Sequence, residues 1–323
     1  EINTISLNPL NFQVYDYREL SRLTEFSGYP FNLSIVSKLS TITARNIYSV
    51  RPIFLTLMSY SSSIDIKNIT VDSNSDSLFS PYLALYGGLA PSTSINLTID
   101  LILGRGIHSD SFIYFTPHLS NNKRQEDPEP TIPSNIQISK VIIQNSNLRL
   151  FDFFAGQSPA KLSVSDVIFY NCVGSVLRAD AAIDVLAKNI IFASGSSLPV
   201  LEFIDIQTSN NIQNIIIANT NNLGDSAISA LETNLNISSF VITNTFSNLK
   251  FTRGNSSINE FTCLFNANNQ QIGGCIWLLR AQTSIQNSIF EYNLAKVGGG
   301  IYANQSRVDM PQGNQLRRKD RKS

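Results

Sequence analysis

The sequence has few charged residues and few residues of the types that bind metal ions. Charged side chains make up 15% of the 323 residues, and 24 basic residues balance 24 acidic ones, so the net charge is zero. This balance gives no reason to expect binding to nucleic acid or to an anionic membrane surface. Only two histidines and three cysteines are present, and they do not cluster. The sequence therefore predicts neither a metal site nor a cofactor.

Long apolar runs are also missing. No run approaches the roughly 18 residues that a membrane-spanning helix needs, so no transmembrane segment is predicted. The chain starts at Glu1 without a methionine or an apolar signal segment. We interpret it as a mature or trimmed product.

The asparagines favour a secreted or cell-surface location, whereas the cysteines decide little. Cys263 and Cys275 form the only plausible internal disulfide, and Cys172 is left free or pairs between chains. Asn-x-Ser/Thr sequences, the acceptor sites of N-glycosylation, occur six times. A chain so rich in Asn and Ser produces some of these by chance. The six candidate asparagines are Asn32, Asn68, Asn96, Asn236, Asn255 and Asn304.

The C-terminal part of the chain contains an internal repeat. The segment CLFNANNQQIGGCIWL (263–278) resembles SIFEYNLAKVGGGIYA (288–303) at an offset of 25 residues. This alignment places Asn268 with Asn293 and Ile276 with Ile301. The glycines of the repeat also coincide, and they are Gly273, Gly274, Gly298, Gly299 and Gly300.

The same element recurs upstream in steps of similar length. Each unit has a run of β-branched and aromatic residues, then Asn or Ser, then a polar turn and further short apolar runs. Three short strands per roughly 25 residues, without helical periodicity, predict the coil of a β-solenoid. Asn tolerates the left-handed backbone of a sharp corner, and stacked amides can bond to one another inside the solenoid. The alternative is that Asn is common here and suits any turn. The predicted ladder consists of Asn145, Asn171, Asn219, Asn244, Asn268 and Asn293.

These features resemble the right-handed parallel β-helix of the pectin-lyase-like group. The last two coils are also similar to the polymorphic outer membrane protein repeat, whose marks are Phe-x-x-Asn followed by Gly-Gly-Ala-Ile. Here the marks are Phe265 to Asn268 with Gly273 to Ile276, and Phe290 to Asn293 with Gly298 to Ile301; Cys275 and Gly300 replace the alanine. The resemblance implies an extracellular or cell-surface solenoid used for adhesion or assembly. The resemblance assigns no catalytic residues to this chain.

One predicted strand of each earlier coil is apolar at three consecutive positions, where a strand with one buried face should alternate. We therefore expect something to cover the outward row, either the N-terminal residues, the long insertion or another subunit. This row consists of Ile142, Ile168, Ile191, Ile216 and Val241. In the last two coils Asn266 and Glu291 interrupt the apolar pattern.

The predicted domain organisation has three parts. Residues 1–60 are irregular and are expected to cap the solenoid, since an open end exposes unpaired strand edges. Residues 61–306 form the β-helix, interrupted at 116–134 by a proline-rich loop. Residues 307–323 are basic, without strand pattern, and are expected to be a disordered tail.

The sequence is compatible with three classes of function. The first is a non-enzymatic structural glycoprotein that assembles with itself, for example into head-to-tail filaments, or adheres to another cell-surface protein. The second is a polysaccharide-binding module, and the third is a polysaccharide lyase or hydrolase. The best acidic cluster for an enzyme combines Arg178 with Asp180, Asp184, Glu202 and Asp205. Because these residues stand at scattered offsets among apolar neighbours, we predict no catalytic residues and favour the structural function. His108 and His118 lie in or beside predicted loops, which argues against a catalytic histidine.

Overall fold

The computed structural model describes residues 12–14, 31–37, 42–49, 53–59, 62–72, 83–86, 95–116, 134–154, 160–180, 184–196, 199–206, 208, 210–220, 226–272, 274–311 and 313–317. Strands are the only regular elements in these ranges. No helix long and apolar enough to cross a membrane occurs among these residues. The chain divides into two compact units, residues 1–162 and 163–323.

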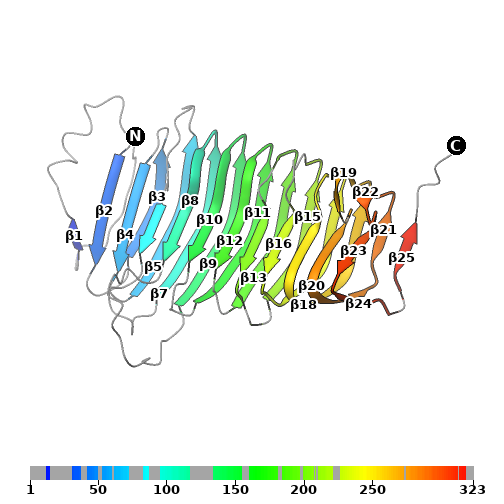
Figure 1. The fold of residues 1–323 in the computed structure, drawn as a ribbon. Coiled ribbons are helices and arrows are strands. Elements are labelled where there is room, and N and C mark those ends of the chain that lie inside the picture. The colour runs from blue at the N-terminus through cyan, green and yellow to red at the C-terminus, as the bar shows by residue number, and fades with distance from the viewer. Residues whose placement is uncertain are drawn as a thin grey trace, which may run out of the picture. The chain divides into compact units, whose positions relative to one another are not determined.

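The N-terminal unit is built from two stacks of parallel strands (Figure 1). The first stack pairs β2 (Phe31–Ser37), β4 (Ile53–Ser59), β6 (Leu83–Tyr86), β8 (His108–Thr116) and β10 (Asn147–Phe154) in that order. The second stack pairs β3 (Ile42–Ser49), β5 (Ser62–Asp72), β7 (Ile95–Arg105) and β9 (Ser134–Gln144). The short β1 (Phe12–Val14) runs antiparallel to β2.

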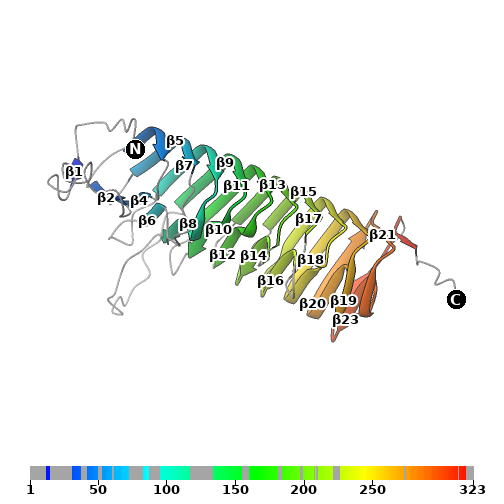
Figure 2. The same ribbon diagram turned by 90° about the horizontal axis from the view of Figure 1, so that it is seen from above.

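The C-terminal unit continues the same alternation. One stack contains β11 (Ala160–Tyr170), which leads into the unit, β13 (Asp184–Ala193), β15 (Asn210–Ala218) and β17 (Leu235–Thr243). The other contains β12 (Val173–Asp180), β14 (Leu201–Ile204) and β16 (Ile228–Leu231). Figure 2 shows these two stacks as separate rows of strands. The long β18 (Leu249–Leu264) pairs with both β16 and β17.

The last coils of this unit contain shorter strands. β18 is followed by β20 (Ile276–Gln286) and β21 (Ile289–Glu291), and then by β23 (Ile301–Asn304), β24 (Arg307–Asp309) and β25 (Gln315–Arg317). β19 (Ala267–Ile272) and β22 (Leu294–Val297) form a separate parallel pair.

In the stack of β13, β15 and β17, each strand bends once at a residue in the left-handed conformation. In β13 this residue is Asn189 (φ 55°), in β15 Asn214 (φ 53°) and in β17 Ser239 (φ 52°). The bend divides the strand into two straight segments, and the next strand supplies a third. The predicted all-β parallel solenoid with three short strands per coil is therefore confirmed.

Alternation of apolar and polar residues fixes which face of each segment is buried. The burial of β15, for example, changes at every residue on each side of Asn214. Inward phenylalanines stack from coil to coil, as the rings of Phe240, Phe261 and Phe290 do at centroid distances of 5.9 and 5.4 Å. Such contacts add roughly 0.5–1.5 kcal/mol each to the gain from burial.

Two of the predicted segments contain more regular structure than expected. Residues 31–59, in the predicted capping region, contain β2, β3 and β4, which already take part in parallel pairing. The tail expected to be disordered contains β24 and β25, which pair with β20 and β21. Backbone pairing with the preceding coil orders this segment despite its basic composition. The predicted loop lies outside the described residues except for Thr116 and Ser134, which end β8 and begin β9.

The predicted outward apolar row lies on the surface of both units. Ile142 belongs to the N-terminal unit, and Ile168, Ile191 and Ile216 belong to the C-terminal one. These four side chains are 37–41% exposed, and Val241 is half-buried. The described residues thus leave most of this row uncovered.

Candidate functional site: the last coils of the C-terminal unit

The predicted asparagines largely occupy left-handed corners, as their chemistry suggests. Asn145 (φ 49°) lies at a corner of the N-terminal unit, and Asn171, Asn219 and Asn244 (φ 50–54°) lie at corners of the C-terminal unit. All four are exposed. Asn244 Nδ2 donates to Asn219 Oδ1 at 2.8 Å. The amides therefore stack on the outside of the solenoid, whereas the sequence predicted a ladder inside it.

The predicted equivalence of Asn268 and Asn293 is wrong. Phe265 (φ 53°) and Tyr292 (φ 57°) occupy the corresponding corners, and Asn268 pairs with Ala295 in the β19–β22 ladder. The sequence separation between equivalent positions of neighbouring coils changes here. It is 21 residues between Thr245 and Asn266 and 27 residues between Asn266 and Asn293. The offset returns to 25 where Ile276 pairs with Ile301. An offset of 25 is therefore correct only for the second half of the repeat.

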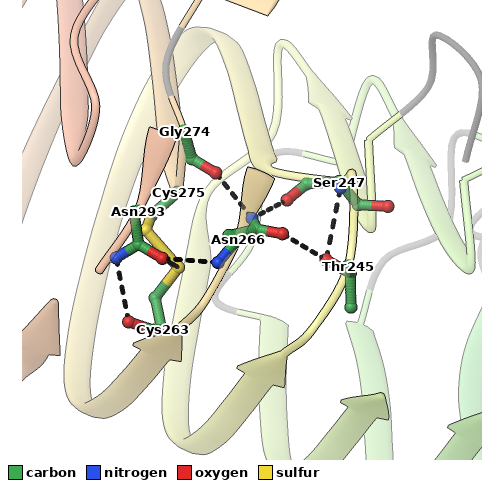
Figure 3. Close-up of a disulfide and its surroundings, with 7 residues drawn as sticks. All are labelled: Thr245, Ser247, Cys263, Asn266, Gly274, Cys275 and Asn293. Atoms are coloured by element: carbon green, nitrogen blue, oxygen red, sulfur yellow. Dashed lines mark hydrogen bonds between the residues drawn. A yellow bond between two sulfur atoms is a disulfide. The ribbon is translucent and has the colours of Figure 1, made fainter. Parts of the chain in front are cut away.

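Asn266 is the centre of a buried hydrogen-bond network (Figure 3). Its Oδ1 accepts a bond from Thr245 Oγ1, and its Nδ2 donates to the carbonyl oxygens of Ser247 and Gly274. Its backbone N–H donates to Asn293 Oδ1 at 2.9 Å. Asn293 Nδ2 donates in turn to the carbonyl of Cys263 at 3.0 Å. The network ties three successive coils together through polar groups that would otherwise be buried without partners.

A disulfide between Cys263 and Cys275 closes the loop that contains Asn266 (Figure 3). It joins the end of β18 to the start of β20, and both cysteines are fully buried. Cys172 is buried and takes no part in the disulfide, and its Sγ donates to the carbonyl of Tyr170 at 3.3 Å. Closing a loop of this size contributes about 3 kcal/mol in the chain-entropy view of disulfides.

Two of the repeat glycines meet a steric requirement. A Cβ on Gly274 would collide with the carbonyl of Gly299 in the next coil, and Gly298 has a left-handed backbone (φ 68°). Gly299 is tight against the carbonyl of Asn293, at 3.0 Å from an added Cβ, whereas Gly300 has nothing within 4 Å. Gly273 lies outside the described residues.

The corner row changes character at the last coils. Phe265 and Tyr292 replace the asparagines, and their rings stack at a centroid distance of 5.1 Å and an interplanar angle of 11°. Phe265 is 55% exposed. A bulky side chain at a left-handed position is uncommon, and ring stacking offsets part of the strain.

The inward apolar rows continue into the last coil and become exposed there. Phe290 in β21 is only 2% exposed, but Leu316, its register partner in β25, is 64% exposed. Ile301 pairs with the fully buried Ile276 and is itself half-buried. In the part of the chain that the structure describes, β23, β24 and β25 pair with strands only on the side of the preceding coil.

The candidate glycosylation sites lie on the surface wherever their side chains are described. Asn32 lies in β2, and its side chain is outside the described set. The other five, all exposed, are Asn68, Asn96, Asn236, Asn255 and Asn304.

The acidic cluster considered for catalysis does not form one site. Glu202 lies opposite Arg178 in the β12–β14 ladder, with Arg178 Nε 3.6 Å from Glu202 Oε2. Asp180 lies opposite Ile204, Asp205 follows at a left-handed corner, and Asp184 begins β13. No group of three His, Cys, Asp or Glu residues suited to a metal ion occurs among the described residues. His108 is the first residue of β8 and is half-buried, and His118 is outside the described ranges.

A second polar row, formed by residues at the strand bends, was not predicted from the sequence. Asn214 Nδ2 donates to Asn189 Oδ1 at 3.0 Å, and Asn189 Nδ2 donates to Asp166 Oδ1 at 2.7 Å. Each of these bends lies five residues before a corner, as Asn214 does before Asn219. That constant interval is the signal in the sequence that locates this row.

In the N-terminal unit, Asp100 lies directly before the bend of β7 at Leu101 (φ 65°). Its carboxylate accepts bonds from Ser139 Oγ at 2.8 Å and from Lys140 Nζ at 3.1 Å. The hydroxyl of Ser139, followed by the charge and hydrogen bond of Lys140, lowers the pKa of Asp100, against an opposing effect of burial. This carboxylate is therefore a structural acceptor in its charged form.

Comparison with known proteins gives no relative from which a function can be carried over: no family model, no curated protein and no solved structure matches the chain.

Proposed function

We propose that this chain is a non-enzymatic, extracellular structural solenoid of the right-handed, pectin-lyase-like kind, which assembles by adding β-strands of a second copy to its last coil. The observation that carries the proposal is the exposure of Leu316. It occupies an inward position of the solenoid, directly over the buried Phe290, and yet it is open to solvent.

The last coil offers both an apolar surface and a hydrogen-bonding edge. Leu316, Ile301 and the half-buried Val308 continue rows that are buried one coil earlier. Complete burial of one such side chain contributes about 1.5–3 kcal/mol. Backbone N–H and C=O groups along the strand edges can form hydrogen bonds that orient an added strand, as in other cases of strand addition.

The N-terminal unit offers an edge of matching type. β3 pairs in parallel with β5, and no strand pairs with its other edge in the described part of the chain. Joining this edge to the last coil of another copy is a heterologous contact. Heterologous contacts generate open filaments when the rotation does not close a ring.

An extracellular location is supported by the disulfide and by the sequons. A buried disulfide persists in oxidising compartments and is rare in the cytosol, which suits the bond between Cys263 and Cys275. Five acceptor asparagines have exposed side chains, as N-glycosylation of a folded glycoprotein requires.

The non-enzymatic part of the proposal is supported by the way the carboxylates are used. Glu202 lies beside Arg178, Glu232 pairs with Arg253 and Asp152 pairs with Arg149. These ion pairs occupy separate coils of the solenoid. Glycoside hydrolysis requires two carboxyl groups facing each other across one substrate, roughly 5–10 Å apart.

Sedimentation velocity over a range of protein concentrations tests the proposal. We expect the unaltered chain to associate as concentration rises and Leu316→Lys to remain monomeric, because the lysine charge cannot be buried between coils. Leu231→Lys is the matched control, since Leu231 is also an exposed leucine but lies in β16, several coils from the last one. A wild-type chain that stays monomeric at high concentration contradicts the proposal, and so does equal loss of association in both variants.

A further inference from the structure

One outward surface of the C-terminal unit carries uncharged polar side chains in register. Asn211 in β15 pairs with Asn236 in β17, Asn236 with Ser257 in β18, and Ser257 with Ser284 in β20. The first three are exposed and Ser284 is half-buried. Strand spacing places neighbouring members of the row about 4.8 Å apart.

Asn236 differs from the rest of this row in being the acceptor of a sequon. It is followed by Ile237 and Ser238, and the strand alternation turns Asn236 and Ser238 outward while Ile237 is only 2% exposed. The neighbours of Asn236 in the row are the short side chains of Asn211 and Ser257. They leave room above the sheet for a sugar and can bond to its hydroxyl groups.

Asn96 has the same arrangement in the N-terminal unit. It is followed by the buried Leu97 and by Thr98 on the outward surface of β7. Asn135 Nδ2 donates to Asn96 Oδ1 at 3.1 Å, which fixes the orientation of the Asn96 amide. N-glycosylation occurs at Nδ2 and retains Oδ1 as an acceptor, so this hydrogen bond is compatible with an attached sugar.

We infer that Asn96 and Asn236 carry N-linked glycans. The inference rests on the extracellular location in the proposed function. In the modification, the side-chain nitrogen forms a bond to the anomeric carbon of an oligosaccharide and loses one proton. The bond between that carbon and the lipid pyrophosphate of the donor breaks, and the pyrophosphate leaves. Such lipid-linked donors belong to the secretory pathway.

The apolar row lies on a different part of the same strands. Ile191, Ile216 and Val241 follow the bends at Asn189, Asn214 and Ser239, whereas Asn211 and Asn236 precede the bends. No sequon begins after the bend in β11, β13, β15 or β17. Glycans at Asn96 and Asn236 therefore cover polar surfaces and leave the outward isoleucines free of sugar.

Mass spectrometry of the protein isolated from its own cells tests the inference. Peptide-N-glycosidase in ¹⁸O-labelled water converts each glycosylated asparagine into a labelled aspartate. We expect this label at Asn96 and Asn236 and its absence at Asn211, which lies beside Asn236 but has Gln213 in place of Ser or Thr.

Two variants, passed through a eukaryotic secretory pathway, separate the sequon from its surroundings. Ser238→Ala is expected to remove the label from Asn236. Gln213→Thr creates a sequon at Asn211 and is expected to add one label there, because the two positions are equivalent in the fold. Unlabelled Asn96 and Asn236 in secreted protein contradict the inference and leave the proposed function standing. A native protein confined to the cytosol contradicts both.

Discussion

Asn244 donates its side-chain amide to Asn219 Oδ1 across 2.8 Å, although the two residues are 25 positions apart in the chain. Both lie at left-handed corners on the surface of the solenoid. One residue type thus provides the corner conformation and a bond to the next coil. The regular spacing of asparagine in the sequence follows from these two requirements.

Asn244→Ala is expected to lower the free energy of unfolding by about 1–2 kcal/mol. Alanine is strained in the left-handed conformation. Loss of the exposed side-chain hydrogen bond to Asn219 lowers the stability by a smaller amount. Asn244→Gly removes the same bond without that strain and is expected to lower stability less. Chemical denaturation measures both variants. Equal losses in the two would show that the corner conformation does not explain the asparagine.

Asp100 is expected to make the N-terminal unit less stable in acid. Its folded-state pKa is lowered from the ordinary value of 3.8, first of all by the Ser139 hydroxyl, so folding favours the charged form. The resulting stabilisation is present above about pH 4 and is lost as the pH falls through the folded-state pKa. Thermal unfolding between pH 7 and pH 2 should show this loss in the wild type and a smaller one in Asp100→Asn. An unchanged pH profile in the variant would contradict the assignment.

Gly274→Ala is expected to destabilise the last coils by more than about 1 kcal/mol, because the added Cβ collides with the Gly299 carbonyl. Gly300→Ala is the matched control. Its Cβ meets nothing within 4 Å, and its backbone φ is not in the left-handed region. We expect no loss of stability there, or a gain of a few tenths of a kcal/mol. Differential scanning calorimetry of the two variants decides between these outcomes, and similar losses would contradict the close approach of the two coils.

Removing the disulfide by Cys263→Ser and Cys275→Ser is expected to reduce stability by about 3 kcal/mol and to increase amide exchange around Asn266. Cys172→Ser is the control, because Cys172 takes no part in the disulfide and lies in another coil. Hydrogen exchange locates the effect. Faster exchange across the whole unit would contradict a local stabilisation of the Asn266 network by the disulfide. Unchanged exchange around residues 264–275 would contradict it as well.

The solenoid could be predicted from the sequence because its determinants are local and periodic. Inward phenylalanines and isoleucines alternate with polar residues, and asparagine marks the corners. The register at Asn268 could not be predicted, because a register shift inside β19, between Asn268 and Ile272, changes the offset there, and the offset is 25 again where Ile276 pairs with Ile301. The strands β24 and β25 were also missed. They contain three residues each, mostly polar or charged, and pairing with the preceding coil orders them.

Of the predicted ladder residues, only Asn293 belongs to the buried network, whose other side-chain members include Thr245 and Asn266. Thr245 and Asn266 follow the corner residues Asn244 and Phe265 directly, and the side chains after the corners point inward while those at the corners point outward. A repeat pattern shows that a polar residue recurs, but it does not show on which side of the backbone the next residue lies. That distinction requires the three-dimensional turn.

Hydrogen exchange of residues 301–317, compared between dilute and concentrated protein, tests the central proposal most directly. If a second copy adds strands to the last coil, the amides of β23, β24 and β25 become protected as the protein associates. The same amides should remain unprotected in Leu316→Lys. Association that leaves these amides unchanged, or that protects only a distant surface such as the outward isoleucine row, would contradict assembly through the last coil.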